Sequence, residues 1–438
     1  GYIPAAEAQA LKGKRLRLSP RDIPAIADAP YFVDHVRRHL QTEFGTDRTF
    51  GGGLKVQTTL DRELQAAAEA AVGSNLGKPG EPSAAIVAIE PSTGAIRAMV
   101  GGMSFKEMKF NLATQGRRQT GSAFKAFTLA AAVEKGIALD SVWSGPGALT
   151  VPDPRCVGAG GVPWTVHNYG DATAGTMSLA QATANSVNTI YAQLATTVGP
   201  DAIVDMAHRM GIASELQPVC SITLGSQPVS PLEMTSGFAT LAARGVYRPP
   251  SAVERVTSSS GDDLFLLDTE GKQVLKKKHA DLVTYALQGV IKSGTGMGAD
   301  IGRPAAGKTG TAQNYQDAWF CGYVPQLAAC VWVGYPEGAI PMLGVRGYPE
   351  VFGGSIPTDI WHDFMAEALG SMPVAPFADP FGRPESSEDS IFSEGPVGPV
   401  ESIAPTASAS PSLVSEPSPT PKPSPTDPTP QPLVTITP

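Results

Sequence analysis

Three short motifs occur in order along the chain and constrain its fold, because their chemistry requires them to meet: Ser122-Ala123-Phe124-Lys125, Ser186-Val187-Asn188 and Lys308-Thr309-Gly310-Thr311. The first supplies a serine nucleophile and a lysine, the second a hydroxyl and an amide, and the third donors suited to a carboxylate. Average residue usage gives roughly one or two chance matches to each of the first two motifs and about one chance in ten for Lys-Thr-Gly. Their order and local settings together indicate an acyl-transfer site.

The first motif lies at the start of a predicted helix, after the polar stretch 117–121 and before the apolar stretch 123–133. Three residues apart on a helix, Ser122 and Lys125 share one face, so that Oγ and Nζ can hydrogen-bond. A desolvated lysine near a second cation can take the serine proton, and Lys308 is the candidate cation. The alternative is a helix-capping serine beside a solvated lysine.

The second motif lies within residues 177–194, where small, apolar and polar residues alternate as in a half-buried helix that breaks near the serine. Ser186 is predicted to relay protons, and Asn188 is predicted to hold the lysine and a substrate carbonyl. An ordinary Ser/Asn loop cap is the alternative.

The third motif is predicted to lie on a strand, because two strand-like runs, 318–324 and 327–334, follow it. Its glycine lets a ligand backbone approach closely, and its other residues present donors to a carboxylate: Lys308, Thr309 and Thr311. Backbone N–H groups of this strand and of the serine are candidates for an oxyanion hole. The alternative is an edge strand protected by a lysine, with a bulge at the glycine.

The remaining pattern predicts an α/β (α+β) sandwich. Residues 83–102 are predicted to form a strand hairpin around Pro91-Ser92-Thr93-Gly94, and residues 280–292 a helix. The strand of Lys308 is predicted to continue into a hairpin at 318–334. Strands at both ends with helices between them predict an antiparallel β-sheet flanked by helices.

With these motifs the chain resembles the transpeptidase domain of class A penicillin-binding proteins, which share a fold with the serine β-lactamases. The resemblance covers about three quarters of the sequence. Beyond the three motifs it rests on the segments Phe110-Asn111-Leu112-Ala113-Thr114, Asn168-Tyr169-Gly170, Asp317-Ala318-Trp319-Phe320, Val331-Trp332-Val333-Gly334-Tyr335 and 357–369.

The resemblance implies a serine D,D-transpeptidase that cross-links peptidoglycan. Ser122 would attack the bond between the two terminal D-alanines of a stem peptide, with Lys125 as base. Ser186 would pass the proton to the leaving amine, and Asn188 would orient Lys125 and the substrate amide. The substrate carboxylate would be bound by Lys308, Thr309 and Thr311, with Gly310 as a further substrate-binding residue. The N–H groups of Ser122 and Thr311 would form the oxyanion hole. An amine of a neighbouring stem peptide would accept the acyl group, and β-lactams would acylate the same serine.

Two alternative functions share these motifs. Transfer of the acyl group to water would make the protein a D,D-carboxypeptidase or endopeptidase, and binding without turnover would make it a β-lactam- or peptidoglycan-binding module. Rapid β-lactam hydrolysis is not predicted. Val187 stands where class A β-lactamases carry an aspartate, and no Glu-x-x-Leu-Asn pattern lies between the second and third motifs.

Composition divides the chain into three predicted parts. Residues 1–53, with short helices predicted at 5–11 and 31–43, resemble the connector that follows the glycosyltransferase domain of bifunctional members. Residues 54–370 are expected to form the transpeptidase domain. Residues 371–438 contain 17 of the 40 prolines and are expected to form a disordered Pro/Ser/Thr-rich tail. We expect a fragment whose membrane anchor and glycosyltransferase domain precede residue 1, acting at the extracytoplasmic face of the cell membrane.

Charge and cysteine content add limited information. No basic run accompanies the formal net charge of −8, so nucleic-acid binding is not predicted. If residues 325–326 form a hairpin turn, Cys321 and Cys330 face each other, either as a disulfide or as a reduced, packed pair. Cys156 and Cys220 could form a second bridge. No metal site and no organic cofactor are predicted.

Overall fold

The computed structural model describes residues 28–157 and 159–382, together with residues 4, 6, 9, 10 and 12. The chain divides into two compact units, residues 1–383 and 384–438, and all the described residues belong to the first. The predicted tail from residue 383 onward lies outside the described residues, as does most of the helix predicted at 5–11.

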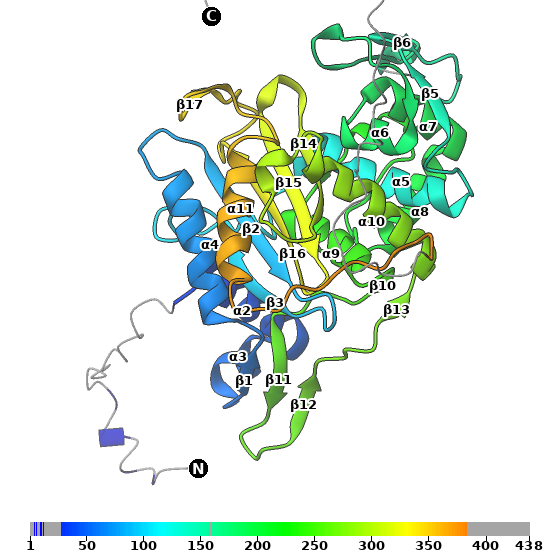
Figure 1. Ribbon diagram of the computed structural model, residues 1–438. Helices are drawn as coiled ribbons and strands as arrows, with labels where there is room; N and C mark the ends of the chain where they lie inside the picture. Colours follow the sequence, from blue (N-terminus) through cyan, green and yellow to red (C-terminus); the bar gives the residue numbers. More distant parts are fainter. Residues whose placement is uncertain are drawn as a thin grey trace, which may run out of the picture. The chain divides into compact units, whose positions relative to one another are not determined.

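A five-stranded antiparallel sheet forms the centre of the first unit, in the order β14-β15-β16-β2-β3 (Figure 1). This confirms the predicted fold class and both predicted hairpins. The strands are β2 Ser83–Ile89, β3 Ile96–Val100, β14 Ala306–Thr311, β15 Asp317–Val324 and β16 Leu327–Gly334.

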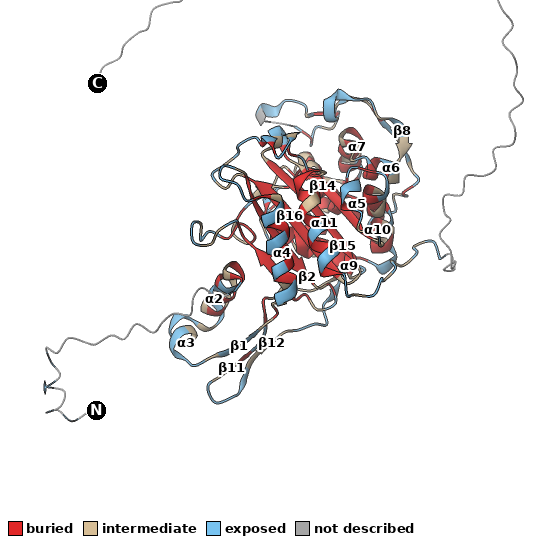
Figure 2. Cartoon of the chain, turned by 60° about the vertical axis from the view of Figure 1, so that its left-hand side comes forward, coloured by how far each residue is buried: buried red, intermediate tan, exposed pale blue. Residues whose placement is uncertain are grey.

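Helices cover both faces of the sheet, so β15 and β16 are buried along their whole length (Figure 2). One face packs against α5 Lys125–Glu134, α9 Pro231–Ala242 and α10 Lys277–Lys292, and the other against α4 Arg62–Asn75 and α11 Ile356–Ala368. Successive residues of β2 alternate between the two cores, with Val87 in the first and Ile86 in the second. Burial on both faces explains why these strands appear in the sequence as continuous apolar runs.

Both ends of the described chain pack onto this unit. Within the predicted connector, α2 Pro30–Phe44 buries Phe32 and Leu40 in the first core. At the other end, the ring of Phe377 lies 5.7 Å from that of Tyr323. The packed chain therefore begins before residue 54 and continues past the predicted boundary at 370.

The remaining helices are α3 Thr46–Gly51, α6 Leu179–Ala184, α7 Asn188–Val198 and α8 Pro200–Arg209. The remaining strands form a small sheet, β1 Lys55–Thr58 with β11 Val253–Thr257 and β12 Asp263–Leu266, and five pairs: β4 Arg118–Gln119 with β9 Pro228–Val229, β5 Val142–Gly145 with β8 Gly175–Ser178, β6 Ala148–Thr150 with β7 Thr165–His167, β10 Val246–Tyr247 with β13 Lys272–Gln273, and β17 Leu343–Val345 with β18 Tyr348–Glu350. Within the described part of the chain, no helix combines the length and apolar character needed to cross a bilayer.

Candidate active site

Ser122 lies in a 3-10 turn, Gly121–Phe124, that leads directly into α5. The serine is partly exposed and lines a cleft of about 1060 Å³. Four other predicted site residues line the same cleft: Ser186, Asn188, Thr309 and Thr311. The structure therefore brings all three motifs to one cavity, although they are far apart in the sequence.

Lys125 begins α5 and is fully buried beneath the cleft. Its Nζ donates to the backbone oxygen of Ser186 at 2.7 Å and to Asn188 Oδ1 at 2.7 Å, and lies 3.2 Å from Ser186 Oγ. These three hydrogen bonds all go to the second motif, whereas the sequence predicted a direct bond to Ser122. Burial, reinforced by the charge of Lys308, lowers the pKa of Lys125 well below its ordinary value, which favours the neutral amine.

The second motif connects two helices at a sharp bend. α6 ends at Ala184 and α7 begins at Asn188, and Ser186 between them has a left-handed φ of 55°. This confirms the predicted helix break. A positive φ is unusual for a serine, and such local strain is often found at functional sites. The amide of Asn188 also donates to the backbone oxygen of His167 at 2.9 Å, which ties the motif to the cleft wall.

Lys308 on β14 is also fully buried and does not line the cleft. Its Nζ donates to Ser186 Oγ at 2.8 Å and to the backbone oxygen of Thr309 at 3.1 Å. The Ser186 hydroxyl and the amines of Lys125 and Lys308 thus form one network, because both amines contact the single Ser186 Oγ. This chain of contacts can pass a proton between the two lysines through the serine hydroxyl.

The threonines of the third motif provide the polar surface of the cleft. Thr309 Oγ1 lies 2.6 Å from Thr295 Oγ1, and Thr311 Oγ1 accepts from the backbone N–H of Gly353 at 3.1 Å. Thr295 also lines the cleft. The sequence analysis did not identify Thr295, since it lies in no recognised motif and reaches the site only through the fold.

Four glycines pack closely where the nucleophile turn meets β14, and we call Gly121, Gly225, Gly310 and Gly353 the glycine cluster. A Cβ on Gly310 would lie 2.2 Å from the backbone oxygen of Thr120, and one on Gly121 would lie 2.2 Å from that of Thr311. Likewise a Cβ on Gly225 would lie 2.2 Å from the backbone oxygen of Gly121, and one on Gly353 would lie 2.6 Å from the nitrogen of Gly310. This close approach brings the Ser122 turn and the end of β14 together, as an oxyanion hole formed by their backbone N–H groups requires.

Gly310→Ala is expected to lower the free energy of unfolding by about 3 kcal/mol, because backbone atoms on both sides must move to admit the methyl group. Urea unfolding measures the change. Gly73→Ala is the matched control: a Cβ there meets nothing within 4 Å, so helix α4 should gain up to about 1 kcal/mol. Equal stability of Gly310→Ala and the unaltered chain would contradict the close packing.

Lys308→Met should change the pH dependence of stability. Burial lowers the pKa of Lys308 from 10.5 to about 7, so between these values the unfolded chain binds more protons than the folded chain. The free energy of unfolding attributable to this lysine therefore rises with pH, by at most about 1.4 kcal/mol per pH unit. The variant should be most stable relative to the unaltered chain below pH 7, and its advantage should shrink as the pH rises toward about 9.

Urea unfolding over this pH range tests the Lys308→Met prediction, with the exposed Lys278→Met on α10 as the control. Loss of the Lys308 charge also raises the pKa of Lys125, which acts in the same direction. A stability difference that does not vary with pH would contradict the lowered pKa of the buried Lys308.

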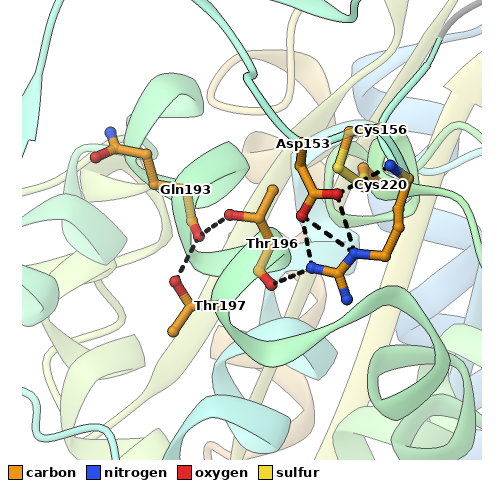
Figure 3. The surroundings of a disulfide bond; sticks show 7 residues. Asp153, Cys156, Gln193, Thr196, Thr197 and Cys220 are labelled. Atoms are coloured by element: carbon orange, nitrogen blue, oxygen red, sulfur yellow. Dashed lines mark hydrogen bonds and ion pairs between the residues drawn. A yellow bond between two sulfur atoms is a disulfide. The ribbon is translucent and has the colours of Figure 1, made fainter.

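A disulfide joins Cys156 to Cys220 (Figure 3), and residues that follow each cysteine line one wall of the cleft. Cys156 precedes the wall residues 164–169, and Cys220 begins a 3-10 turn, Cys220–Leu224, whose Ser221 and Leu224 line the same cleft. Nearby, Arg155 pairs with Asp153 and donates to the backbone oxygen of Thr196 on α7 at 3.2 Å. The second bridge, Cys321–Cys330, joins facing residues of β15 and β16, in the register expected from a turn at 325–326.

Comparison with known proteins identifies the family. Residues 84–337 match the model of the penicillin binding protein transpeptidase domain. The chain belongs to this family. The transpeptidase region is 37% identical to penicillin-binding protein 1A of Mycobacterium tuberculosis over 343 residues, which cover 72% of this chain. It is 30% identical to penicillin-binding protein 2D of Bacillus subtilis over 367 residues, or 81% of this chain.

Solved structures agree with this membership in the class A group. The PonA1 protein of M. tuberculosis in complex with penicillin V matches with a TM-score of 0.71 and 34% identity, over 80% of this chain and 96% of that one. Penicillin-binding protein 1A of Haemophilus influenzae matches with a TM-score of 0.72 at 22% identity, which supports the fold alone. The chain spans 40% of the length of the M. tuberculosis penicillin-binding protein 1A and 51% of the B. subtilis protein.

Proposed function

We propose that this chain is a serine D,D-transpeptidase that cross-links peptidoglycan stem peptides and is acylated by β-lactams. The observation that carries the proposal is that the buried amines of Lys125 and Lys308 both contact the hydroxyl of Ser186. Ser122, at the start of a helix, lines the cleft beside them. Family membership supports the reaction class. The PonA1 complex with penicillin V supports β-lactam binding.

The first half-reaction forms an acyl-enzyme. Ser122 Oγ attacks the carbonyl carbon of the penultimate D-alanine while its proton passes to the neutral amine of Lys125. The new C–O bond forms, the C–N bond breaks, and the terminal D-alanine leaves after accepting that proton through Ser186. In this scheme the N–H groups of Ser122 and Thr311 stabilise the oxyanion.

The second half-reaction transfers the acyl group to an amine. The acceptor nitrogen attacks the ester carbon, a C–N bond forms, and the C–O bond to Ser122 breaks. The proton lost by the amine returns to Ser122 Oγ by way of Lys125.

Substrate binding is assigned to Thr309 and Thr311, whose side chains line the cleft, with Gly310 giving access to the strand. Lys308 would act on the carboxylate mainly through the positive field of its protonated form, since its amine lies beneath the cleft surface.

The proposal extends to the organisation and location of the chain. The predicted division into a connector at 1–53, a transpeptidase domain at 54–370 and a tail at 371–438 is supported in its centre by the family match at 84–337. The two disulfides support an oxidising compartment, and we place the domain at the extracytoplasmic face of the cell membrane.

Mass spectrometry of the intact chain after incubation with a penicillin tests the proposal, with peptide mapping of the adduct. A stable adduct on the Ser122 peptide is expected. Incubation with an acyl-D-alanyl-D-alanine donor and an amine then separates the functions: cross-linked product supports transpeptidation, and hydrolysed product alone indicates a carboxypeptidase. A chain that binds the drug without forming an adduct would be a binding module.

A further inference from the structure

A hydrogen bond joins a cleft-lining tyrosine to a strand end that is distant in the sequence. The hydroxyl of Tyr169, in the loop between β7 and β8, donates to Glu350 Oε2 at the end of β18 at 3.3 Å. Tyr169 lines the cleft and is 77% exposed, so little packing holds its ring in place. A single long hydrogen bond between exposed groups is weak, and an entering ligand can therefore replace it.

A second tyrosine approaches the same carboxylate from the sheet side. Tyr315, in the connection between β14 and β15, also lines the cleft. Burial, together with hydrogen bonds to Glu350 and Tyr169, raises the pKa of its hydroxyl. Asn314 and Tyr315 both have left-handed φ values, 57° and 55°, and the backbone oxygen of Tyr315 accepts from the N–H of Met342 at 3.1 Å. The fold thus holds a tyrosine beside Glu350 at an energetic cost to the backbone.

Basic and acidic side chains lie in different parts of the site. Two lysines lie beneath the second and third motifs. Among the described residues that line the cleft there is no lysine or arginine, and Glu350 forms no ion pair. The other carboxylate near the wall, Asp171, lies 2.6 Å from His167 Nδ1. Glu350 therefore lies next to the cleft-lining residues Tyr169 and Tyr315, and its described hydrogen-bond partners are their hydroxyl groups.

We infer that Glu350, between Tyr169 and Tyr315, determines acceptor specificity by receiving the protonated amine of the acceptor in place of the Tyr169 hydroxyl. The inference rests on the proposed transpeptidase function, whose donor carries a carboxylate and whose acceptor enters as an ammonium ion. A carboxylate with adjacent aromatic rings suits such a cation through a charge-assisted hydrogen bond and cation–π contact. Before it attacks, the bound ammonium gives one proton to solvent water and leaves Glu350 as the neutral amine. The bond changes at Ser122 are then those given above, and the second proton of the nitrogen passes to Ser122 Oγ by way of Lys125.

Glu350→Gln tests this role, because it removes the charge and retains a hydrogen-bond acceptor for Tyr169. The full chain is acylated with a thioester analogue of acyl-D-alanyl-D-alanine, and thiol release monitors acylation. Transfer is then measured to D-alanine amide, which carries an ammonium group, and to hydroxylamine, which is uncharged at neutral pH. The variant should raise the KM for D-alanine amide about tenfold, while transfer to hydroxylamine keeps its KM.

Two further variants distinguish charge recognition from a structural role of the bridge. Glu337→Gln removes the same charge from an exposed position in the same segment and should leave both KM values unchanged. Tyr169→Phe removes the hydroxyl that competes for Glu350, so its KM for D-alanine amide should stay equal or fall. A rise in KM for both acceptors, or equal losses in Tyr169→Phe and Glu350→Gln, would overturn the inference in favour of a structural bridge.

Failure of the inference and failure of the proposed function have different signatures. An unchanged KM for D-alanine amide in Glu350→Gln overturns the inference alone, since the unaltered chain still transfers to amines. Acylation by the thioester without transfer to either acceptor by the unaltered chain overturns the proposed transpeptidase and the inference with it.

Discussion

Ser122→Ala is expected to abolish covalent labelling by penicillin, with a fall in acylation rate of at least about 10⁴-fold. Of the described hydroxyl groups near the start of α5, that of Ser122 lines the cleft, whereas Thr120 and Thr128 are buried. The neighbouring Ser186 is already engaged with both lysines. Intact-protein mass spectrometry over a time course measures the rate. The loss should be specific to chemistry, because Ser122 Oγ makes no hydrogen bond within the described structure whose removal would destabilise the fold.

Ser226→Ala is the control for Ser122→Ala, since Ser226 lines the same cleft outside the three motifs. Its labelling rate should stay within about twofold of that of the unaltered chain, because the hydroxyl bonds only to Ser221 among described residues. A full-stoichiometry adduct in Ser122→Ala would show that the nucleophile has been assigned to the wrong residue.

Lys125→Met should lower the acylation rate by about 10³-fold, in the range found for loss of a general base. Burial and the charge of Lys308 lower the pKa of Lys125, so the amine is neutral above that value and gains a proton below it. The acylation rate of the unaltered chain should therefore fall as the medium is acidified, and the residual rate of the variant should lack this dependence. Penicillin acylation followed by mass spectrometry across a pH series measures both effects.

Circular dichroism and thermal unfolding must accompany Lys125→Met, because the change leaves Asn188 Oδ1 and the Ser186 carbonyl without their donor. The exposed Lys278→Met serves again as the matched control and should retain the rate and pH profile of the unaltered chain. A folded Lys125→Met variant with an unchanged rate would exclude Lys125 as the base.

Local patterns in the sequence predicted the parts of the site that depend on neighbouring residues. The helix start at the first motif follows from a polar entry and an apolar continuation, and the break at Ser186 follows from an interrupted helical pattern. The strand of Lys308 was predicted from the two apolar runs after it. Each of these features is decided within about twenty residues.

Long-range contacts decided the features that the sequence left open or predicted differently. Lys125 bonds to the second motif because α7 brings Asn188 to it, across a sequence separation of 63 residues. Lys308 lies on an edge strand, yet the turn at Gly121–Phe124 and α10 cover that edge and bury its amine. The hydrogen-bond partners Tyr169 and Glu350 are 181 residues apart, and only the resemblance of the Asn168-Tyr169-Gly170 segment had marked one of them.

The glycine cluster also limits how this protein can escape a drug under selection. At these four positions the side chain of a larger residue would meet backbone atoms. Substitutions there are therefore expected to destabilise the fold, so a cell that carries them also loses the enzyme. Changes that exclude an antibiotic while the enzyme stays active are therefore expected to accumulate at exposed residues of the cleft, where side chains have room to vary: Thr165, His167, Tyr169, Gln313, Asn314 and Phe352. Target-site resistance in this transpeptidase would then arise through altered access to an unchanged catalytic centre.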